Sequence, residues 1–541
     1  MSLRRLRCRT QPADLSTQAP RASSAAAANL ADLAERAFAR AAGAPSTDGN
    51  AVRLLCDARE NFPAWREALA GAQRYILFEQ YIVEDDRIGR DFAMLLAERA
   101  RAGVRVYVII DWLGCWRALS LWRAVRDAGA DVRVFNPPRL SSPLGWLSRD
   151  HRKTIVVDGD IGFVSGLCVS ERWVGDPKRR LEPWRDTGIE IRGPAIAALE
   201  QAFMRVFAAS GNPLDAEGFA DVDSIAPAGS MRLHVIANEP NLAGTFRMDL
   251  VIAAIARKQL WLTDAYFVAT APYVQALRAA ARDAVDVRLL VPGSSDIPAL
   301  SPLSRAQYRP LLEAGVRVFE WAGTMLHAKT AVADRRWSRV GSTNLNLASW
   351  MSNYELDVAI EDASFAELLA AQYENDLEHS TEIVLTRRNR VRRATGAAQQ
   401  GAHARTRHAA SGSAGRAAAG AFSVGSALGA ALTDRRILGP AEAGLLFMMA
   451  SVAAVIGIIG ALWPRVLAWP VAFVALWSGT AWIVKGISLR RGRRGGPRVE
   501  RLEDAMAPAA GAPPDAPPPE PPEKRAPQAE TDNARDHMTS R

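Results

Sequence analysis

Two short stretches of the chain place a histidine, a lysine and an aspartate in the same frame, His-x-Lys-x4-Asp. DHRKTIVVDG contains His151, Lys153 and Asp158, and LHAKTAVAD contains His327, Lys329 and Asp334. Side chains alternate along a strand, so the histidine and the lysine of each copy project from one face. Burying both groups is costly unless each has a polar partner. A single copy would more often be a core histidine beside a lysine, but two of only seven histidines occupy this frame, which favours a shared site.

Attack on a phosphodiester needs a nucleophile, positive charge beside the phosphoryl oxygens and an acid for the departing alkoxide, so two histidines are the minimum set for such chemistry. One imidazole can attack phosphorus and form a covalent intermediate, while the other protonates the departing alkoxide and later deprotonates the incoming alcohol. Lys153 and Lys329 can stabilise charge on the phosphoryl oxygens without a metal ion. No Cys-x2-Cys spacing occurs among Cys8, Cys56, Cys115 and Cys168. We therefore expect neither a metal site nor another cofactor, and a reducing compartment.

The elements that must position these residues are those of an α/β domain. From residue 46 to 385, short β-branched runs alternate with amphipathic helical patterns. The stretch also repeats itself: QRYILFEQYIV matches RKQLWLTDAYFV, GVRVYVIID matches AVDVRLLVP, and AGADVRVF matches AGVRVF, each series followed by its His-x-Lys strand. The repeat predicts a duplicated domain with halves at 46–215 and 216–385.

The flanking segments have compositions that do not suit a packed core. Residues 1–45 are a low-complexity extension, and the Pro-rich tail 487–541 is expected to be disordered. The linker 386–440 is basic: from Arg387 to Arg416 it holds eight arginines and no acid. This run suits an anionic surface, and a solvated linker is an equally good interpretation.

Residues 441–486 are predicted to form a transmembrane helical hairpin. Two apolar runs, Ala443–Trp463 and Val466–Val484, are each long enough to cross a bilayer. The alternative is a buried hairpin of a soluble domain, for which little covering surface is at hand. Basic residues flank both outer ends, so both ends and the catalytic domain are expected on the cytoplasmic side of the cell inner membrane. No apolar segment follows the basic N-terminus, which argues against a secretory signal.

Two His-x-Lys-x4-Asp units in a duplicated α/β chain resemble the phospholipase D superfamily. Ser165-Gly166 and Gly341-Ser342 follow the two motifs at the same distance. DAYFVATAPYVQALRAAARDAVDVRLLVPGSSD and TMLHAKT are similar to the bacterial cardiolipin synthase branch, and the resemblance covers roughly Val52 to Asp362. It implies two pseudo-symmetric αβα halves that meet at one site.

The resemblance also implies a role for each motif residue. His151 would be the nucleophile and His327 the general acid and base. Each histidine would be oriented by a carboxylate from the other half, His151 by Glu355 and His327 by Asp186. The motif also includes Lys153, Lys329 and the aspartates Asp158 and Asp334, which would support the motif turns rather than touch phosphate.

Other positions typical of the family imply supporting residues, and at two positions this sequence departs from the family pattern. Ser342 and Asn344 match supporting positions after the second motif. The first half has Cys168 where the second has Asn344, and Ala348 replaces a common arginine. We expect these departures to affect acceptor specificity more than catalysis.

The implied activity is a phosphatidyltransferase that makes cardiolipin from phosphatidylglycerol and a second phospholipid. A hydrolytic phospholipase D, with water as acceptor, is the alternative, and a nuclease of the same superfamily that uses the arginine run is a weaker one. A non-catalytic scaffold is disfavoured because both histidines and both lysines are present. Expected partners are phospholipids and a membrane, and no nucleic acid. The sequence leaves the oligomeric state open.

Overall fold

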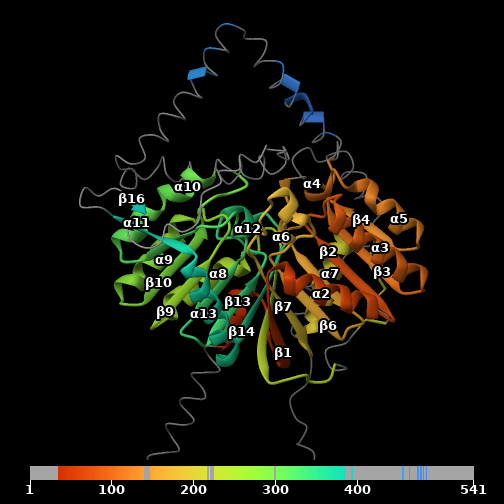
Figure 1. The fold of residues 1–541 in the computed structure, drawn as a ribbon, viewed down its shortest axis with the longest axis horizontal. Coiled ribbons are helices and arrows are strands. Elements are labelled where there is room, and N and C mark those ends of the chain that lie inside the picture. The colour runs from red at the N-terminus through yellow and green to blue at the C-terminus, as the bar shows by residue number, and fades with distance from the viewer. Residues whose placement is uncertain are drawn as a thin grey trace, which may run out of the picture. The chain divides into compact units, whose positions relative to one another are not determined.

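A single large sheet organises the described part of the chain (Figure 1). The computed structural model describes residues 35–385 apart from 139–146, 216–217, 220–224 and 298–299, together with 391–393 and isolated residues between 454 and 483. Within this part, sixteen strands form the sheet in the order β16-β15-β11-β10-β9-β12-β13-β14-β8-β1-β7-β6-β5-β2-β3-β4. The predicted α/β class is therefore correct.

The strand order is the same on both sides of the sheet's centre. There β1 (Ser46–Cys56) pairs antiparallel with β8 (Met231–Asn238). Outward from β1 follow β7 (Thr187–Arg192), β6 (Ile161–Ser165), β5 (Lys153–Val157), β2 (Tyr75–Gln80), β3 (Arg105–Asp111) and β4 (Asp131–Phe135). Outward from β8 follow β14 (Glu355–Glu361), β13 (Trp337–Gly341), β12 (Thr330–Ala333), β9 (Gln259–Thr263), β10 (Asp286–Pro292) and β11 (Arg317–Trp321). The strands β15 (Ser380–Leu385) and β16 (Val391–Arg393) extend the sheet beyond β11.

The two motif strands occupy equivalent places in this order. β5 lies antiparallel between β2 and β6, and β12 lies antiparallel between β9 and β13. The outer strands β2, β3 and β4 are parallel, as are β9, β10 and β11. Parallel neighbours need helical crossovers, which supply apolar cover for both faces of the sheet.

Helices cover both faces of the sheet. The longer ones are α2 (Asp57–Gly71), α3 (Arg87–Arg101), α7 (Ala195–Ala209), α8 (Gly244–Ile255), α9 (Ala271–Arg282) and α13 (Ala363–Glu378). The shorter ones are α4 (Trp112–Cys115), α5 (Trp122–Asp127), α6 (Glu171–Val174), α10 (Leu300–Ala306), α11 (Tyr308–Glu313), α12 (Leu347–Met351) and the 3-10 turns η1 (Leu119–Leu121) and η3 (Pro177–Arg179). A helical segment at residues 35–42 precedes β1.

The core lies in two layers, one on each face of the sheet. Tyr75 and Leu77 of β2 belong to the cluster that also holds α7 and α13, whereas Ile76 and Phe78 belong to the cluster of α2, α3 and α5. On the second half, α8, α9 and α11 form the corresponding outer cluster. Strand residues that are buried on both faces explain why YILFEQ reads as a nearly continuous apolar run.

The predicted segments outside the α/β domain fall mostly on residues that are not described. The hairpin at 441–486, the extension at 1–45, the linker at 386–440 and the tail at 487–541 lie wholly or mainly outside the described residues. Among the residues that are described, no helix is both long and apolar enough to span a bilayer. The hairpin and the domain boundaries remain predictions.

Candidate active site

Backbone pairing across the two halves places each motif histidine. The amide of His151 donates to the carbonyl of Tyr354 at 2.9 Å, and the amide of His327 donates to the carbonyl of Arg185 at 2.7 Å. Tyr354 immediately precedes Glu355 at the start of β14, and Arg185 immediately precedes Asp186 just before β7. Each histidine is therefore held against the segment of the other half that carries a carboxylate.

Each imidazole meets that carboxylate through Nδ1. His151 Nδ1 lies 2.8 Å and 3.0 Å from the two carboxylate oxygens of Glu355. His327 Nδ1 lies 2.8 Å from Asp186 Oδ2. Because a carboxylate accepts a hydrogen bond, it favours the neutral imidazole whose proton is on Nδ1. The other ring nitrogen, Nε2, then has a free lone pair. The arrangement is that of a nucleophile or base whose ring is oriented by an acid.

The two carboxylates are themselves held by neighbours. Glu355 accepts from Ser342 Oγ at 2.6 Å and from Asn353 Nδ2 at 3.3 Å. Asp186 accepts from the indole Nε1 of Trp173 at 2.8 Å and from the amide of Thr187 at 2.9 Å. These donors prevent either carboxylate from rotating away from its histidine.

Both motif lysines point back to their own histidine. Lys153 Nζ donates to the carbonyl of His151, and Lys329 Nζ donates to the carbonyl of His327. Lys329 Nζ also lies 2.9 Å from His327 Nδ1. Each ammonium group therefore lies beside a reactive ring, where it can stabilise an anion bound between the histidines.

Burial and the lysines keep both imidazoles uncharged at neutral pH. Burial lowers the pKa of His151 to about 4, although Glu355 acts in the opposite direction. Burial, helped by Lys329, lowers the pKa of His327 to about 4. Burial also lowers the pKa of Lys329 to about 8, so this amine is still mainly charged at pH 7.

The carboxylates stay ionised beside these rings. Burial alone would raise the pKa of Asp186, but His327 and Lys329 hold it below its ordinary value. Burial would likewise raise the pKa of Glu355, but His151 and Lys153 hold it below its ordinary value. At neutral pH the site therefore combines neutral imidazoles, carboxylates and at least one cationic lysine.

One cavity of about 90 Å³ is lined by both histidines. Its walls are aromatic: Tyr81 meets His151 edge-on at 4.7 Å between ring centroids, and Tyr266 meets His327 at 5.8 Å. Trp173 and Trp184 also line it and lie within 5.4 Å and 5.7 Å of the His327 ring. An apolar wall strengthens electrostatic contacts inside the cavity and keeps bulk water out.

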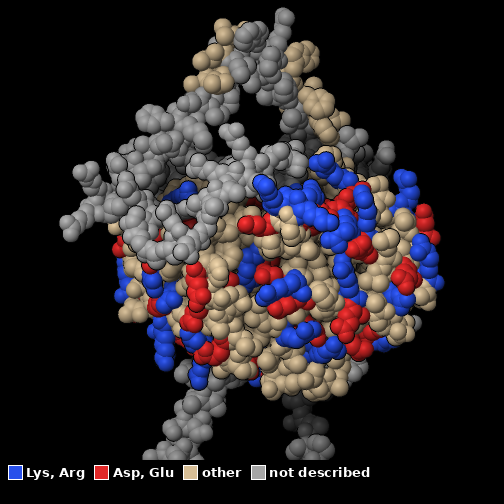
Figure 2. All heavy atoms as spheres, in the orientation of Figure 1, with Lys and Arg blue, Asp and Glu red and all other residues tan. Residues whose placement is uncertain are grey.

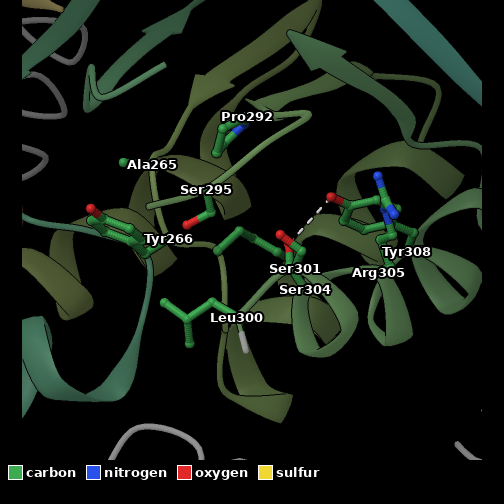
Figure 3. A pocket seen from close by; sticks show the side chains of 10 residues that line it. Ala265, Tyr266, Pro292, Ser295, Leu300, Ser301, Ser304, Arg305 and Tyr308 are labelled. Carbon is green, nitrogen blue, oxygen red and sulfur yellow. Dashed lines mark hydrogen bonds between the residues drawn. The ribbon is translucent and has the colours of Figure 1, made fainter. Parts of the chain in front are cut away.

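A smaller, more polar cavity adjoins the first through Tyr266 and Leu300 (Figure 3). Ser295, Ser301 and Ser304 line it, and Ser304 donates to Tyr308 at 3.3 Å. Its Arg305 is paired with Glu320 at 2.7 Å, so its guanidinium is not left without a counter-charge. Its volume of about 20 Å³ is enough for about one water molecule.

The other predicted positions divide into two groups. Asn344, Cys168 and Ala348 line the main cavity, and burial raises the pKa of the Cys168 thiol. Ser342 contacts Glu355 rather than the cavity.

The motif aspartates lie elsewhere, as their expected structural role requires. Asp158 accepts from the amides of Gln73, Arg74 and Tyr75, and Asp334 accepts from those of Arg257, Lys258 and Gln259. Asp158 follows the far end of β5, seven residues from His151, which corresponds to roughly 20 Å along a strand. Neither aspartate lines the cavity that contains the two histidines.

Several cavity residues were not found from the sequence. Trp173, Trp184, Arg149, Ser349 and Asn353 line the cavity, although no motif contains them. The only signal was indirect: Trp184 stands two residues before Asp186 in EPWRD. Tertiary contacts alone place these side chains beside the histidines.

Within the described residues, the active-site groups do not form a cluster that could hold a metal ion. The three-residue cluster that could do so is Glu35, His234 and Glu361, outside this cavity. The sequence indicated no metal ligands there, because these residues are far apart in the chain.

Comparisons with known proteins identify relatives in sequence and a similar fold. A family model described as "Cardiolipin synthase, PLD-like domain" matches residues 251–377. The chain is 31% identical to a cardiolipin synthase of Halalkalibacterium halodurans over 352 residues, which cover 64% of this chain and 69% of that protein. It is 33% identical to cardiolipin synthase A of Pseudomonas aeruginosa over 375 residues, which cover 66% and 73% of the two chains.

A solved structure has a similar fold. The phosphatidylserine synthase of Haemophilus influenzae aligns with a TM-score of 0.53 at 14% identity, over 64% of this chain and 91% of that one. At this identity, the likeness concerns the fold alone.

Proposed function

Because the chain belongs to the cardiolipin synthase branch of the phospholipase D superfamily, we propose that this enzyme transfers a phosphatidyl group from phosphatidylglycerol to the hydroxyl of a second phospholipid. The observation that carries the proposal is the crossed pairing of His151 with Glu355 and of His327 with Asp186 around one cavity. This pairing supplies two oriented imidazoles, the minimum for a two-step displacement.

In the first step His151 attacks the donor lipid. Its Nε2 lone pair forms a bond to phosphorus, and the phosphorus–oxygen bond to the glycerol head group breaks. Protonated His327 gives its proton to the departing oxygen, so glycerol leaves as a neutral alcohol. Both rings are uncharged before binding, but an anionic phosphodiester between them favours protonation of one ring, because opposite charges raise the pKa of a base.

In the second step the phosphohistidine is resolved by an alcohol. His327, now neutral, takes the proton of the acceptor hydroxyl as the oxygen forms its bond to phosphorus. The phosphorus–nitrogen bond breaks, and its electrons return to His151. Lys153 and Lys329 stabilise the charged phosphoryl oxygens in both steps, an effect of about 3 kcal/mol for each such donor.

Synthesis rather than hydrolysis is supported by the walls of the cavity. Tyr81, Tyr266, Trp173 and Trp184 surround the histidines, and exclusion of water lets a bound alcohol compete with a far more abundant nucleophile.

Exposed basic residues near the cavity suit an anionic lipid surface. Lys178, Arg179 and Arg180 are exposed in the loop between the two cavity tryptophans, Trp173 and Trp184. Figure 2 shows Lys and Arg side chains gathered around the part of the first half where Figure 1 labels α4 and α6. Cationic side chains near an anionic bilayer contribute about 1 kcal/mol each.

Anchoring by the predicted hairpin at 441–486 would keep the site at the bilayer, in the inner membrane with the catalytic domain cytoplasmic. A reporter fused to the C-terminus should then behave as cytoplasmic, and one inserted near Arg465 as external. The reverse pattern would contradict the proposed orientation. A membrane anchor also disfavours the nuclease alternative, because it would hold the enzyme close to lipid substrates but not to a soluble nucleic acid.

The test is the product pattern from phosphatidylglycerol vesicles, followed by lipid mass spectrometry. We expect cardiolipin and free glycerol, with phosphatidic acid as a minor product. His151→Ala should abolish all three, because they share one intermediate. Phosphatidic acid as the main product of the unmodified enzyme would contradict the synthase and favour the hydrolase.

A further inference from the structure

Three chain segments meet at a cluster of ligating side chains away from the catalytic cavity. Glu35 belongs to the helical segment that precedes β1, His234 to β8, and Glu361 ends β14. His234 Nε2 lies 3.2 Å from Glu361 Oε1 and 3.6 Å from Glu35 Oε1. The side chain of His234 is 0% exposed, whereas those of Glu35 and Glu361 are 23% and 33% exposed.

A second contact determines which nitrogen of His234 faces the carboxylates. Its Nδ1 lies 3.1 Å from the carbonyl oxygen of Ala44, an acceptor that requires the proton on Nδ1. In the neutral ring, the lone pair of Nε2 then points at two anionic oxygens. Glu35 Oε1 is moreover buried with no hydrogen-bond partner in the described part of the chain. Three acceptors that converge in this way require a cation between them, either a proton on Nε2 or a metal ion.

The spacing fits a tetrahedral metal ion. With bonds of about 2.1 Å from zinc to nitrogen and oxygen, two ligands of a tetrahedral site are about 3.4 Å apart. The two measured nitrogen–oxygen distances, 3.2 Å and 3.6 Å, lie on either side of this value. The bond from Nδ1 to a backbone carbonyl is also the outer contact that metal-binding histidines ordinarily have.

We propose that Glu35, His234 and Glu361 bind one zinc ion that fastens the helical segment 35–42 to the sheet. One imidazole and two carboxylates favour zinc over magnesium, which prefers oxygen ligands and water. Water can occupy the fourth position, because the Glu361 side chain is 33% exposed. Phe38 from the same helical segment already packs edge-on against the His234 ring at 4.8 Å, so the ion would reinforce an existing contact.

The ion is expected to stabilise the fold and not to take part in the chemistry. β14 carries Glu355 of the active site at one end and Glu361 at the other, so the two sites are roughly 20 Å apart along this strand. Metal that binds the folded chain alone raises its melting temperature in proportion to the logarithm of the free metal concentration.

The experiment measures zinc binding by the full chain, purified in detergent without a histidine tag and treated with a chelator. Titration calorimetry and elemental analysis should find one tightly bound zinc ion per chain, and added zinc should raise the melting temperature. Glu361→Gln and Glu35→Gln should each weaken zinc affinity at least about tenfold, since each removes a ligand. Unchanged circular dichroism would show that these variants still fold.

Two controls separate this site from other histidines. His379→Ala removes an exposed histidine, bonded to the carbonyl of Asn375, and should leave zinc binding unchanged. The double variant His151→Ala/His327→Ala should also keep its zinc ion. If the unmodified chain binds no more zinc than Glu361→Gln, or if zinc is lost from the double variant instead, the proposal is wrong and a proton alone occupies the cluster.

Discussion

With a substrate whose leaving group departs without a proton, Asp186→Asn should stall the enzyme after its first chemical step and thereby reveal the roles of the two histidines. Asp186 accepts from His327 Nδ1 at 2.8 Å, and its negative charge stabilises the imidazolium form of that ring. Asparagine keeps the size of the side chain but removes the charge. The protonated form of His327 that must donate to the leaving group is then less populated, and the neutral ring becomes a poorer base for the acceptor hydroxyl.

The size of the effect follows from the buried ion pair. Two unit charges about 4 Å apart interact by about 4 kcal/mol at an effective dielectric constant of 20. Each 1.36 kcal/mol changes a rate about tenfold, so turnover of phosphatidylglycerol should fall by about 10³. His151 and Glu355 are untouched, so the nucleophile keeps its orientation.

The assay uses a soluble phosphodiester with a nitrophenolate leaving group, which departs without a proton. The Asp186→Asn enzyme should release a burst of nitrophenolate close to one equivalent per active site, followed by slow turnover. Alkaline quenching, which preserves phosphohistidine, and peptide mass spectrometry should place the phosphoryl group on His151. Glu355→Gln should show no burst, because it disturbs the nucleophile itself.

Asp334→Asn is the matched control, because it alters a carboxylate that binds only backbone amides at the other end of its motif strand. It should lower stability while kcat stays within about threefold of the unmodified value. A phosphoryl group found on His327, or a burst from Glu355→Gln instead of Asp186→Asn, would refute the assignment of roles.

Lys153→Ala and Lys329→Ala should each lower kcat by about 10² or more, with unchanged circular dichroism, because each removes a donor to the phosphoryl oxygens; near-normal kcat would place that lysine outside the site. Affinity for inorganic phosphate, followed by calorimetry, should fall as pH rises through about 8, where Lys329 loses its charge, and Lys329→Arg should remove this dependence. The pKa of His151 and of His327 is lowered to about 4 in the folded chain from an ordinary 6.5. The unfolded chain therefore binds more protons between these values, and urea unfolding should show stability that falls by on the order of 3 kcal/mol per histidine as pH drops from 6.5 to 4. His151→Gln should weaken this loss, and an unchanged slope would contradict it. EDTA should leave initial turnover unchanged while it lowers the melting temperature; turnover lost in EDTA and restored by a divalent ion would contradict a metal-free mechanism.

The sequence alone was sufficient to predict the class of the domain and the two motif strands. Local patterns carry this information, because the period of apolar residues distinguishes strands from helices. The repeat of the His-x-Lys frame predicted equivalent positions, and β5 and β12 do occupy equivalent places in the sheet. The crossed partners of the histidines followed from resemblance to a family and not from spacing.

The predicted hairpin rests on the sequence alone. Its apolar runs, Ala443–Trp463 and Val466–Val484, lie almost wholly outside the described residues. The prediction rests on length and hydrophobicity, which decide whether a segment can cross a bilayer but not how it meets the rest of the chain.

Only the tertiary structure decided which distant side chains meet. Trp173 binds Asp186 through its indole, and Asn353 binds Glu355, although no motif includes either donor. No sequence motif contains His234, and its partner Glu361 is 127 residues away. Such meetings depend on strand register and on the pairing of β1 with β8 at the centre of the sheet, which are set by the packing of the whole core. A sequence pattern specifies which face of a strand is buried, but the neighbour across that face is determined only when the two halves close on each other.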